Sequence, residues 1–145
     1  MTLPRKKGPQ CSILLIDKDE KILLQLRDDK PTIHDPGKWG TFGGGIEEGE
    51  TPLQGAIRET KEELDYDLVD PDYAGNYPYN GYDVHFYTKK DPTLKLENLT
   101  VHEGQRAGLF TIKEIKELDT AFNAKEVILA IFCGQTYSKH LKEQN

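Results

Sequence analysis

Cysteine is scarce in this sequence of 145 residues, which contains only Cys11 and Cys133. The two lie far apart and neither has a second Cys at metal-ligand spacing, so the pattern excludes a disulfide framework and a cysteine metal site. We therefore expect two buried free thiols in a reducing compartment. The longest early apolar run, Ile13 to Ile16, is far too short for a secretory signal or a membrane span. These absences predict a cytoplasmic protein that does not enter a membrane.

The sequence also contains fewer basic than acidic residues. The chain has 19 Lys and Arg against 25 Asp and Glu, which gives a net charge of −6 and a pI of about 5.2. It therefore lacks the basic field that a nucleic-acid backbone requires, and we do not expect nucleic acid as a partner. A ligand that carries phosphate would need locally placed Arg and Lys side chains or a bound metal ion.

Length and composition fit one folded domain over residues 1–145, because 36% hydrophobic and 30% charged residues are typical of globular proteins rather than disordered ones. Residues 1–10 are polar, and the cluster Arg5-Lys6-Lys7 is typical of a frayed terminus rather than a binding patch. We expect a flexible N-terminal segment there.

Hydrophobic periodicity predicts strands and two helices. Segments 11–16 and 21–27 flank a polar turn and predict a hairpin, and a loop rich in Gly and Pro follows at 28–40. A helical apolar pattern covers Asn123–His140. The later segments expected as strands are 81–88 and 107–112. Strands before, between and after two helices predict a mixed α/β domain.

The first helix has clear start signals. Thr51 is a good N-cap, Pro52 suits the first helical position, and Gln54 completes a capping-box pattern. One mostly apolar face is expected to contain Leu53, Ala56, Ile57, Thr60 and Leu64.

Three glutamates of this helix, Glu59, Glu62 and Glu63, fall within an arc of roughly 100° that points away from that face. One interpretation is a solvated acidic face, relieved by pairs such as Arg58 with Glu62. The other is a metal site. The helix follows a glycine-rich loop that can expose backbone carbonyls, and carboxylate and carbonyl oxygens are the ligands that Mg²⁺ or Mn²⁺ prefers. Such a site suits metal-assisted chemistry on a phosphate ester or anhydride.

The spacing in this segment carries a further signal. Gly44 is followed after five residues by Glu50, and Glu50 after seven residues by Arg58-Glu59-Thr60-Lys61-Glu62-Glu63-Leu64-Asp65-Tyr66. This pattern resembles the Nudix box, in which Gly, Glu, Arg-Glu and Glu-Glu stand at these same intervals, and every fixed charged position matches. The departures are Thr60 in place of an aliphatic residue, Asp65 in place of a Gly, and Phe42 where many relatives have Pro.

The resemblance implies a fold, an activity and a cofactor. The fold would be an α/β/α sandwich with a mixed central sheet and a catalytic loop–helix–loop. The activity would be Mg²⁺-dependent hydrolysis of a diphosphate linkage in a nucleoside diphosphate derivative, with Mn²⁺ as a substitute. Nucleoside triphosphates, including damaged ones, and nucleotide sugars are the substrate classes expected. Many relatives dimerise, so a homodimer is left open.

Residue roles follow from the matched positions. Glu59 and Glu63 resemble the principal metal ligands and Glu62 a further one, while the carbonyl of Gly43 or Gly44 is expected to supply another oxygen. Arg58 resembles the Arg that pairs with Glu50, so the role of Glu50 would be structural. The backbone at Gly44 is expected to approach the substrate.

A general base is expected from the box or from a later acidic loop. Glu103, within Val101-His102-Glu103-Gly104-Gln105, resembles that later loop as a base and metal ligand, and the alternative is an ordinary polar turn.

The substrate end of the site is less defined by the sequence. Arg27, at the end of a strand, is placed like a phosphate-contacting Arg, and Asn123 lies near where one branch of the family has a base-reading Asn. The aromatic residues are expected either to stack on a base or to pack in the core: Trp39, Tyr73, Tyr77, Tyr79 and Tyr82.

Two other functions belong to different classes. A non-catalytic module that binds a nucleotide and regulates a partner would share the fold, but degenerate modules often lose box charges that this chain retains. Isomerisation of an isoprenoid diphosphate requires a further Cys and Glu constellation that the sequence does not show.

Overall fold

The computed structural model describes residues 7–138, which form a mixed sheet covered on both faces by helices. The strand order is β3-β2-β1-β6-β5, with β4 paired to β1 and β7 paired to β2. β1 and β6 run parallel and the other pairs are antiparallel. The strands are β1 (Gln10–Ile16), β2 (Ile22–Leu26), β3 (Trp39–Gly40), β4 (Phe42–Gly45), β5 (Asp72–Asn76), β6 (Val84–Lys90) and β7 (Arg106–Phe110).

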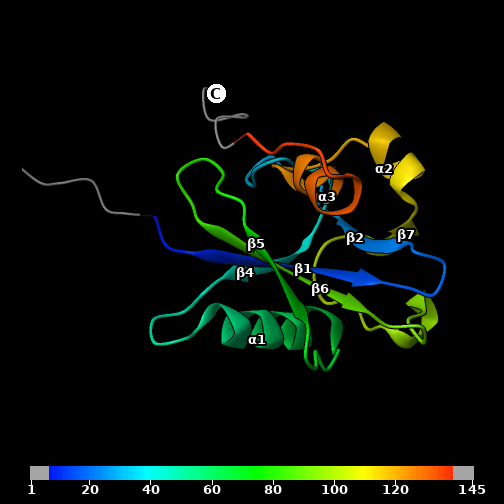
Figure 1. The fold of residues 1–145 in the computed structure, drawn as a ribbon, viewed down its shortest axis with the longest axis horizontal. Helices are drawn as coiled ribbons and strands as arrows, with labels where there is room; N and C mark the ends of the chain where they lie inside the picture. The colour runs from blue at the N-terminus through cyan, green and yellow to red at the C-terminus, as the bar shows by residue number, and fades with distance from the viewer. Residues whose placement is uncertain (1–6, 139–145) are drawn as a thin grey trace, which may run out of the picture.

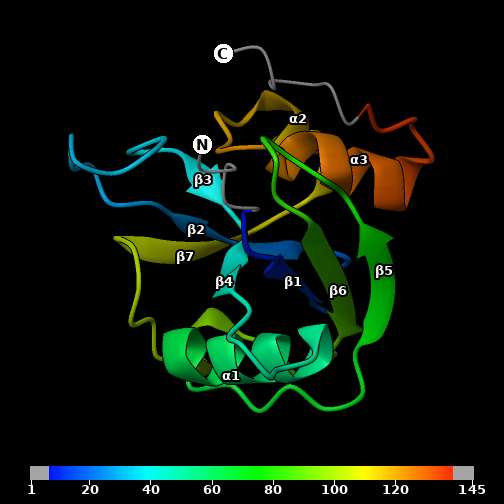
Figure 2. The same ribbon diagram turned by 90° about the vertical axis from the view of Figure 1, so that its left-hand side faces the viewer.

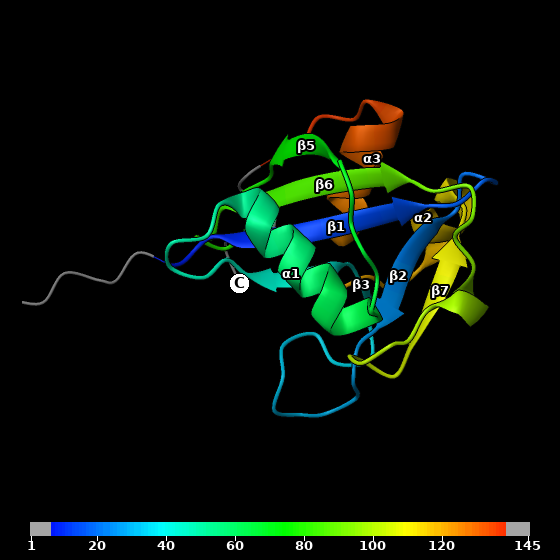
Figure 3. The same ribbon diagram turned by 90° about the horizontal axis from the view of Figure 1, so that it is seen from below.

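Helix α1 (Pro52–Leu64) covers one face of the sheet, and α2 (Ile112–Glu117) and α3 (Ala124–Cys133) cover the other, as Figures 1 and 2 show. Seen from below, α1 lies across β1 (Figure 3). A short 3-10 turn, Leu96–Asn98, precedes β7. The expected α/β/α sandwich with a mixed sheet is confirmed.

The side chains of β1 point alternately to the two faces of the sheet, which explains the two layers of the core. Ile13 and Leu15 pack in the cluster that includes Ala56 and Leu64 of α1. The intervening residues of β1 face the other way, and Leu14 packs in the cluster that contains Val127 and Ile128 of α3. Within residues 7–138, no helix has the length and apolar character needed to cross a membrane.

The capping signals of α1 are confirmed. The Thr51 side chain accepts a hydrogen bond from the Gln54 N–H at 3.1 Å, and the Gln54 side chain accepts one from the Thr51 N–H at 2.8 Å. Asp65 ends the helix in the left-handed conformation, at φ 56°, where the family pattern has Gly.

The prediction of which side chains of α1 are buried is wrong in part. Leu53 and Ile57 are each 40% exposed, whereas Glu63 is only 3% exposed. The helix is rotated so that Ala56, Thr60 and Glu63 face the sheet. Ala56 and Thr60 are small, and the Thr60 hydroxyl is satisfied by the Ala56 carbonyl at 2.6 Å, so the helix can approach the glycine-rich strand β4 closely.

Other boundaries also differ from the sequence prediction. The strand expected to reach Ile112 ends at Phe110, because Thr111 and Glu114 form a capping box that starts α2. The helix expected over Asn123–His140 ends at Cys133, where Gly134 takes a left-handed φ of 66°. His140 lies outside the described residues. β3, β4 and β5 were not predicted, since two are very short or glycine-rich and β5 contains a bulge between Tyr73 and Gly75.

Cys11 is buried as expected, but the expectation for Cys133 is corrected, because it is exposed at the end of α3. Of the N-terminal segment expected to be flexible, residues 1–6 lie outside the described residues. In the remainder, Gln10 begins β1, and the Lys7 ammonium donates a hydrogen bond to the Asn80 carbonyl.

Candidate active site

The glycines of β4 allow the carboxylates of α1 to lie directly against a strand. A Cβ at Gly44 would lie 2.6 Å from Oε1 of Glu59. A Cβ at Gly43 would overlap the Cys11 carbonyl oxygen, and Gly43 has a φ of 151° that other residues rarely adopt. The Gly43 N–H donates to Oε1 of Glu63 at 2.9 Å. Glycine is therefore required here so that helix and strand can meet.

Glu63 lies at the centre of an acidic cluster with Glu59 and Glu103. Its Oε2 atom is buried and has no hydrogen-bond partner among the described residues. Burial raises the pKa of Glu63 well above its ordinary value, and the neighbouring carboxylates of Glu103 and Glu59 raise it further. The pKa of Glu59 is also raised, mainly by burial. The cluster thus brings three carboxyl groups together, and among the described residues only Glu59 has a cation, Arg58, within ion-pair distance.

Backbone contacts bring Glu103 to this cluster from a loop far along the chain. The His102 N–H donates to the Glu63 carbonyl at 2.8 Å, and the Thr100 N–H donates to the Leu64 carbonyl at 3.3 Å. These contacts fix the loop to the end of α1, where the last carbonyls of a helix need partners. Glu103 is exposed, so its carboxylate is open to solvent.

Arg58 forms a separate ion-pair network on the other side of Glu59. Its Nε and Nη2 donate to the two carboxylate oxygens of Glu50 at 2.8 and 3.0 Å, and Nη2 also donates to the Gly45 carbonyl at 2.9 Å. Nη1 contacts Glu59 at 3.1 Å and Glu62 at 3.3 Å. The hydrogen bond to Arg58 lowers the pKa of Glu50. The structure thus contains the Glu50–Arg58 pair that the box implies.

The donor set fits a hard divalent cation. Over residues 7–138, no three His, Cys, Asp or Glu side chains already form a metal-binding group. However, Oε1 of Glu63 accepts a hydrogen bond from the Gly43 N–H, the Glu59 carboxylate lies against Gly44, and Glu103 is close enough to act on Glu63. Among the described residues, the buried Oε2 of Glu63 has no hydrogen-bond partner. Carboxylate and carbonyl oxygens are the ligands of Mg²⁺ and Mn²⁺. Glu62 is more remote, because its side chain is 58% exposed and contacts Arg58.

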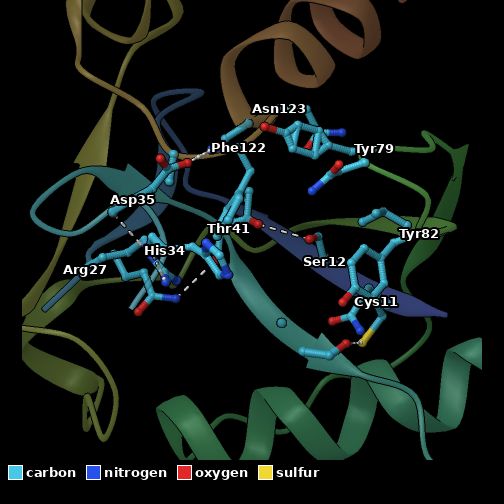
Figure 4. A pocket seen from close by; sticks show the side chains of 18 of the residues that line it. Cys11, Ser12, Arg27, His34, Asp35, Thr41, Tyr79, Tyr82, Phe122 and Asn123 are labelled. Atoms are coloured by element: carbon cyan, nitrogen blue, oxygen red, sulfur yellow. Dashed lines mark hydrogen bonds between the residues drawn. The ribbon is translucent and has the colours of Figure 1, made fainter. Parts of the chain in front are cut away.

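Figure 4 shows the side chains around a cavity of the protein. The cavity has a volume of about 670 Å³ and reaches the acidic cluster at Glu103. Gly43, Gly44 and Glu103 line it where it meets the cluster. Its other lining residues include the polar side chains of Ser12, Gln25 and Thr41, the basic side chains of Lys7 and Arg27, and the planar groups of Tyr79, Tyr82, Phe122 and Asn123. A volume of this size suits a small organic ligand.

Arg27, Gly44 and Asn123, which were predicted to contact substrate, line this cavity. Arg27 donates from Nε and Nη2 to the His34 carbonyl at 3.2 and 2.8 Å, and its guanidinium lies 4.8 Å from the centre of the Phe122 ring. Asn123 is 5% exposed, and its amide donates to the Tyr137 hydroxyl at 2.8 Å.

Trp39 does not line the cavity, contrary to the sequence prediction for this residue. Its ring packs against Phe110 with 4.7 Å between centroids, and the Arg106 guanidinium lies over it. β3 pairs with the outer edge of β2, which directs Trp39 into the core beside α2 and α3.

The tyrosines divide between the cavity and the rest of the fold. Tyr79 and Tyr82 line the cavity on either side of a two-residue turn, Asn80-Gly81, in which both φ angles are positive. Tyr77 packs on Phe86, and the Tyr73 hydroxyl bonds to His85. Asn-Gly between two tyrosines is a strong hairpin signal that sequence reasoning missed. Lys7 and Phe122 carry no comparable local signal.

The sequence was compared with protein families and with known proteins. A family model described as NUDIX domain matches residues 6–131. The chain belongs to the NUDIX domain family. The dihydroneopterin triphosphate diphosphatase of Escherichia coli K12 is 42% identical over 66 residues, which are 44% of this chain and 40% of that relative. The chain thus matches well under half the length of this Nudix relative.

Solved structures show the same Nudix fold at low identity. The DR0079 protein of Deinococcus radiodurans superposes with a TM-score of 0.74 at 12% identity, covering 90% of this chain and 86% of that one. The NUDIX domain of Shewanella oneidensis NrtR, in complex with ADP ribose, has a TM-score of 0.70 at 18% identity and covers 86% of this chain and 85% of that one.

Proposed function

We propose that this Nudix protein is a Mg²⁺-dependent hydrolase that cleaves the diphosphate linkage of a nucleoside diphosphate derivative, either a nucleoside triphosphate or a nucleotide sugar. The observation that carries the proposal is the acidic cluster around the unpartnered, buried Oε2 of Glu63, next to a cavity with basic and aromatic walls. The triphosphate named for the Escherichia coli relative supports the triphosphate class.

In this proposal, Glu59, Glu63, Glu103 and the Gly43 carbonyl hold the cation, and the more exposed Glu62 acts on it through a bound water. A bound Mg²⁺ or Mn²⁺ would neutralise phosphate oxygens and make a bound water more acidic. Arg58 has a supporting role, since it ties Glu50 and the Gly45 carbonyl to the helix that carries Glu59.

Glu103 is the residue best placed to accept a proton from the attacking water. It belongs to the acidic cluster, lines the cavity and is exposed, so water can reach it. The water oxygen would attack phosphorus, its proton would pass to Glu103, and the bridging P–O bond would break to release a phosphate product. Glu63 is too enclosed for this task.

The far end of the cavity would hold the ring of the substrate. Tyr79 and Phe122 lie with centroids 6.2 Å apart and offer planar apolar surfaces, as Tyr82 does. Arg27 keeps its Nη1 clear of hydrogen bonds to the described residues and could meet a phosphate. Lys7 is a second cation at this edge.

A product assay tests the proposal. The purified protein is offered nucleoside triphosphates, nucleotide sugars, dihydroneopterin triphosphate and capped RNA, each with Mg²⁺, Mn²⁺ or EDTA. We expect one class to release phosphate products with the divalent ions and none with EDTA. Hydrolysis that persists in EDTA, or no turnover of any compound, would refute the proposal.

A non-catalytic nucleotide-binding module is the second candidate, because the NrtR domain with the same fold is in complex with ADP ribose. The two candidates differ in what Glu63→Gln does. In a binding module, the substitution would leave ligand affinity intact and there would be no turnover to lose. The box glutamates favour the enzyme.

A further inference from the structure

The loop that follows β2 is tied to the start of α3 by Asp35. Oδ2 of Asp35 accepts a hydrogen bond from the Phe122 N–H at 2.8 Å, across 87 positions of the chain. The Asp35 carbonyl in turn accepts from Nε of Arg27 at 3.3 Å. Figure 4 shows Asp35 between Arg27 and Phe122 at one wall of the cavity. Asp35 therefore connects three separate segments at the point where they line the site.

Phe122 has a backbone conformation that needs outside support. Its φ is 52°, in the left-handed region that bulky residues rarely adopt. On one side, the Ala121 N–H donates to the Trp39 carbonyl at 2.7 Å, and on the other, the amide of Asn123 bonds to the Tyr137 hydroxyl. The Asp35 carboxylate satisfies the N–H of the strained residue itself. Strain that is held in place by such contacts is typical of functional sites.

The support determines where the Phe122 ring lies. The ring has the Arg27 guanidinium 4.8 Å from its centre and the Tyr79 ring 6.2 Å away. Without the Asp35 contact, residue 122 would relax toward negative φ, and the direction of its side chain would change. The planar wall of the cavity would then be lost, while the acidic cluster would be unchanged.

We propose that Asp35 is a positioning residue that fixes Phe122 for binding of the substrate ring, a role that rests on the proposed function. Asp35 acts through the Phe122 backbone and does not touch the reacting atoms. A competing role as a surface ion pair with Lys38 is weaker, because the two groups are 3.8 Å apart and both are partly exposed.

The experiment compares Asp35→Ala with Asp35→Asn, which keeps an oxygen that can accept the Phe122 N–H. Asp29→Ala is the matched control on the same loop, since the exposed Asp29 side chain makes no hydrogen bond or ion pair with the described residues. The measurements are kcat and KM for whichever of ATP, GTP, CTP and UTP the wild type hydrolyses fastest. Inorganic tripolyphosphate, which has no ring, serves as a competitive inhibitor.

We expect Asp35→Ala to raise KM about tenfold, because loss of one aromatic contact with the substrate ring weakens binding by about this factor. We expect kcat to stay within about twofold of wild type. The inhibition constant of tripolyphosphate should rise much less than KM, because the acidic cluster is unchanged and only Arg27, which lies over the Phe122 ring, is near the altered wall. Asp35→Asn should restore a KM near that of wild type. An unchanged KM in Asp35→Ala, or equal weakening of nucleotide and tripolyphosphate, would overturn the proposal.

A second measurement separates this proposal from the proposed function. Hydrogen exchange of the Phe122 amide should be slow in wild type and in Asp35→Asn, and faster in Asp35→Ala. Equal exchange in all three overturns the role of Asp35. If no nucleotide is hydrolysed, the proposed function fails. The role of Asp35 is then tested by titration calorimetry, which measures the dissociation constants of nucleotide and tripolyphosphate for the same variants.

Discussion

Glu50 and Glu63 belong to the same loop–helix segment but have opposite electrostatic surroundings. Glu50 accepts two hydrogen bonds from Arg58, which lower its pKa. Glu63 is buried beside Glu59 and Glu103, and burial raises its pKa. Among the described residues, Glu50 has a cationic partner in Arg58, and Glu63 forms no ion pair.

The difference separates a structural site from a candidate chemical one. The Glu50–Arg58 pair is complete, so its removal should act mainly on folding. The Glu63 cluster keeps like charges together at a cost that folding alone does not explain, which is typical of sites completed by a ligand. Substitutions at the two positions should therefore have different consequences.

The largest expected effect is that of Glu63→Gln on catalysis. A lost metal ligand weakens charge stabilisation by several kcal/mol, so we expect turnover with Mg²⁺ to fall about 100-fold or more. The fold should remain, since Gln can still accept the hydrogen bond from the Gly43 N–H. Steady-state kinetics and circular dichroism check both points. Turnover close to wild type would contradict the ligand role.

Gly44→Ala should have the next largest effect. Its Cβ would lie 2.6 Å from Oε1 of Glu59 and would displace that carboxylate, so we expect kcat/KM to fall about 10- to 100-fold. Gly45→Ala is the matched control, because its Cβ would approach only Gln10, at 3.6 Å. Kinetics on both variants check the prediction, and equal activities would show that close approach at Gly44 is unimportant.

Glu50→Gln should act mainly on stability. Arg58 would lose its charged partner, and we expect Tm to fall by a few degrees while activity falls less than in Glu63→Gln. Because the folded-state pKa of Glu50 lies below its ordinary value of 4.5, this stabilisation is present above pH 4.5 and lost as pH falls through the lowered pKa. Thermal denaturation over this range should show the two proteins converging at low pH.

The smallest expected effect is the opposite pH trend at Glu63. Its folded-state pKa lies above the ordinary 4.5, so metal-free wild type should lose stability relative to Glu63→Gln as pH rises above 4.5. Thermal denaturation in EDTA measures the difference, and Mg²⁺ should reverse it. If the stability of the two proteins changes with pH in the same way, the pKa of Glu63 is not raised in the folded state.

Much of the loop–helix half of the candidate site, from Gly44 to Glu63, was predictable from sequence. The spacing from Gly44 to Glu63 is local, and the capping residues Thr51 and Gln54 fix where the helix starts. The half formed by the walls of the cavity was not. Arg27 and Asn123 were expected there, but Phe122 and Asp35 reach the cavity only through contacts between distant segments, and Trp39 is directed away.

The sequence by itself determined the helix and its caps, because both depend on intervals of a few residues, and the resemblance to the Nudix box implied the pairing of Glu50 with Arg58. Only the tertiary structure decided which side of α1 is buried, because that depends on the glycine strand against which the helix packs. It therefore also decided that Glu63 is the enclosed glutamate. Likewise, the Asp35–Phe122 contact joins positions 87 residues apart, an arrangement that no local pattern specifies.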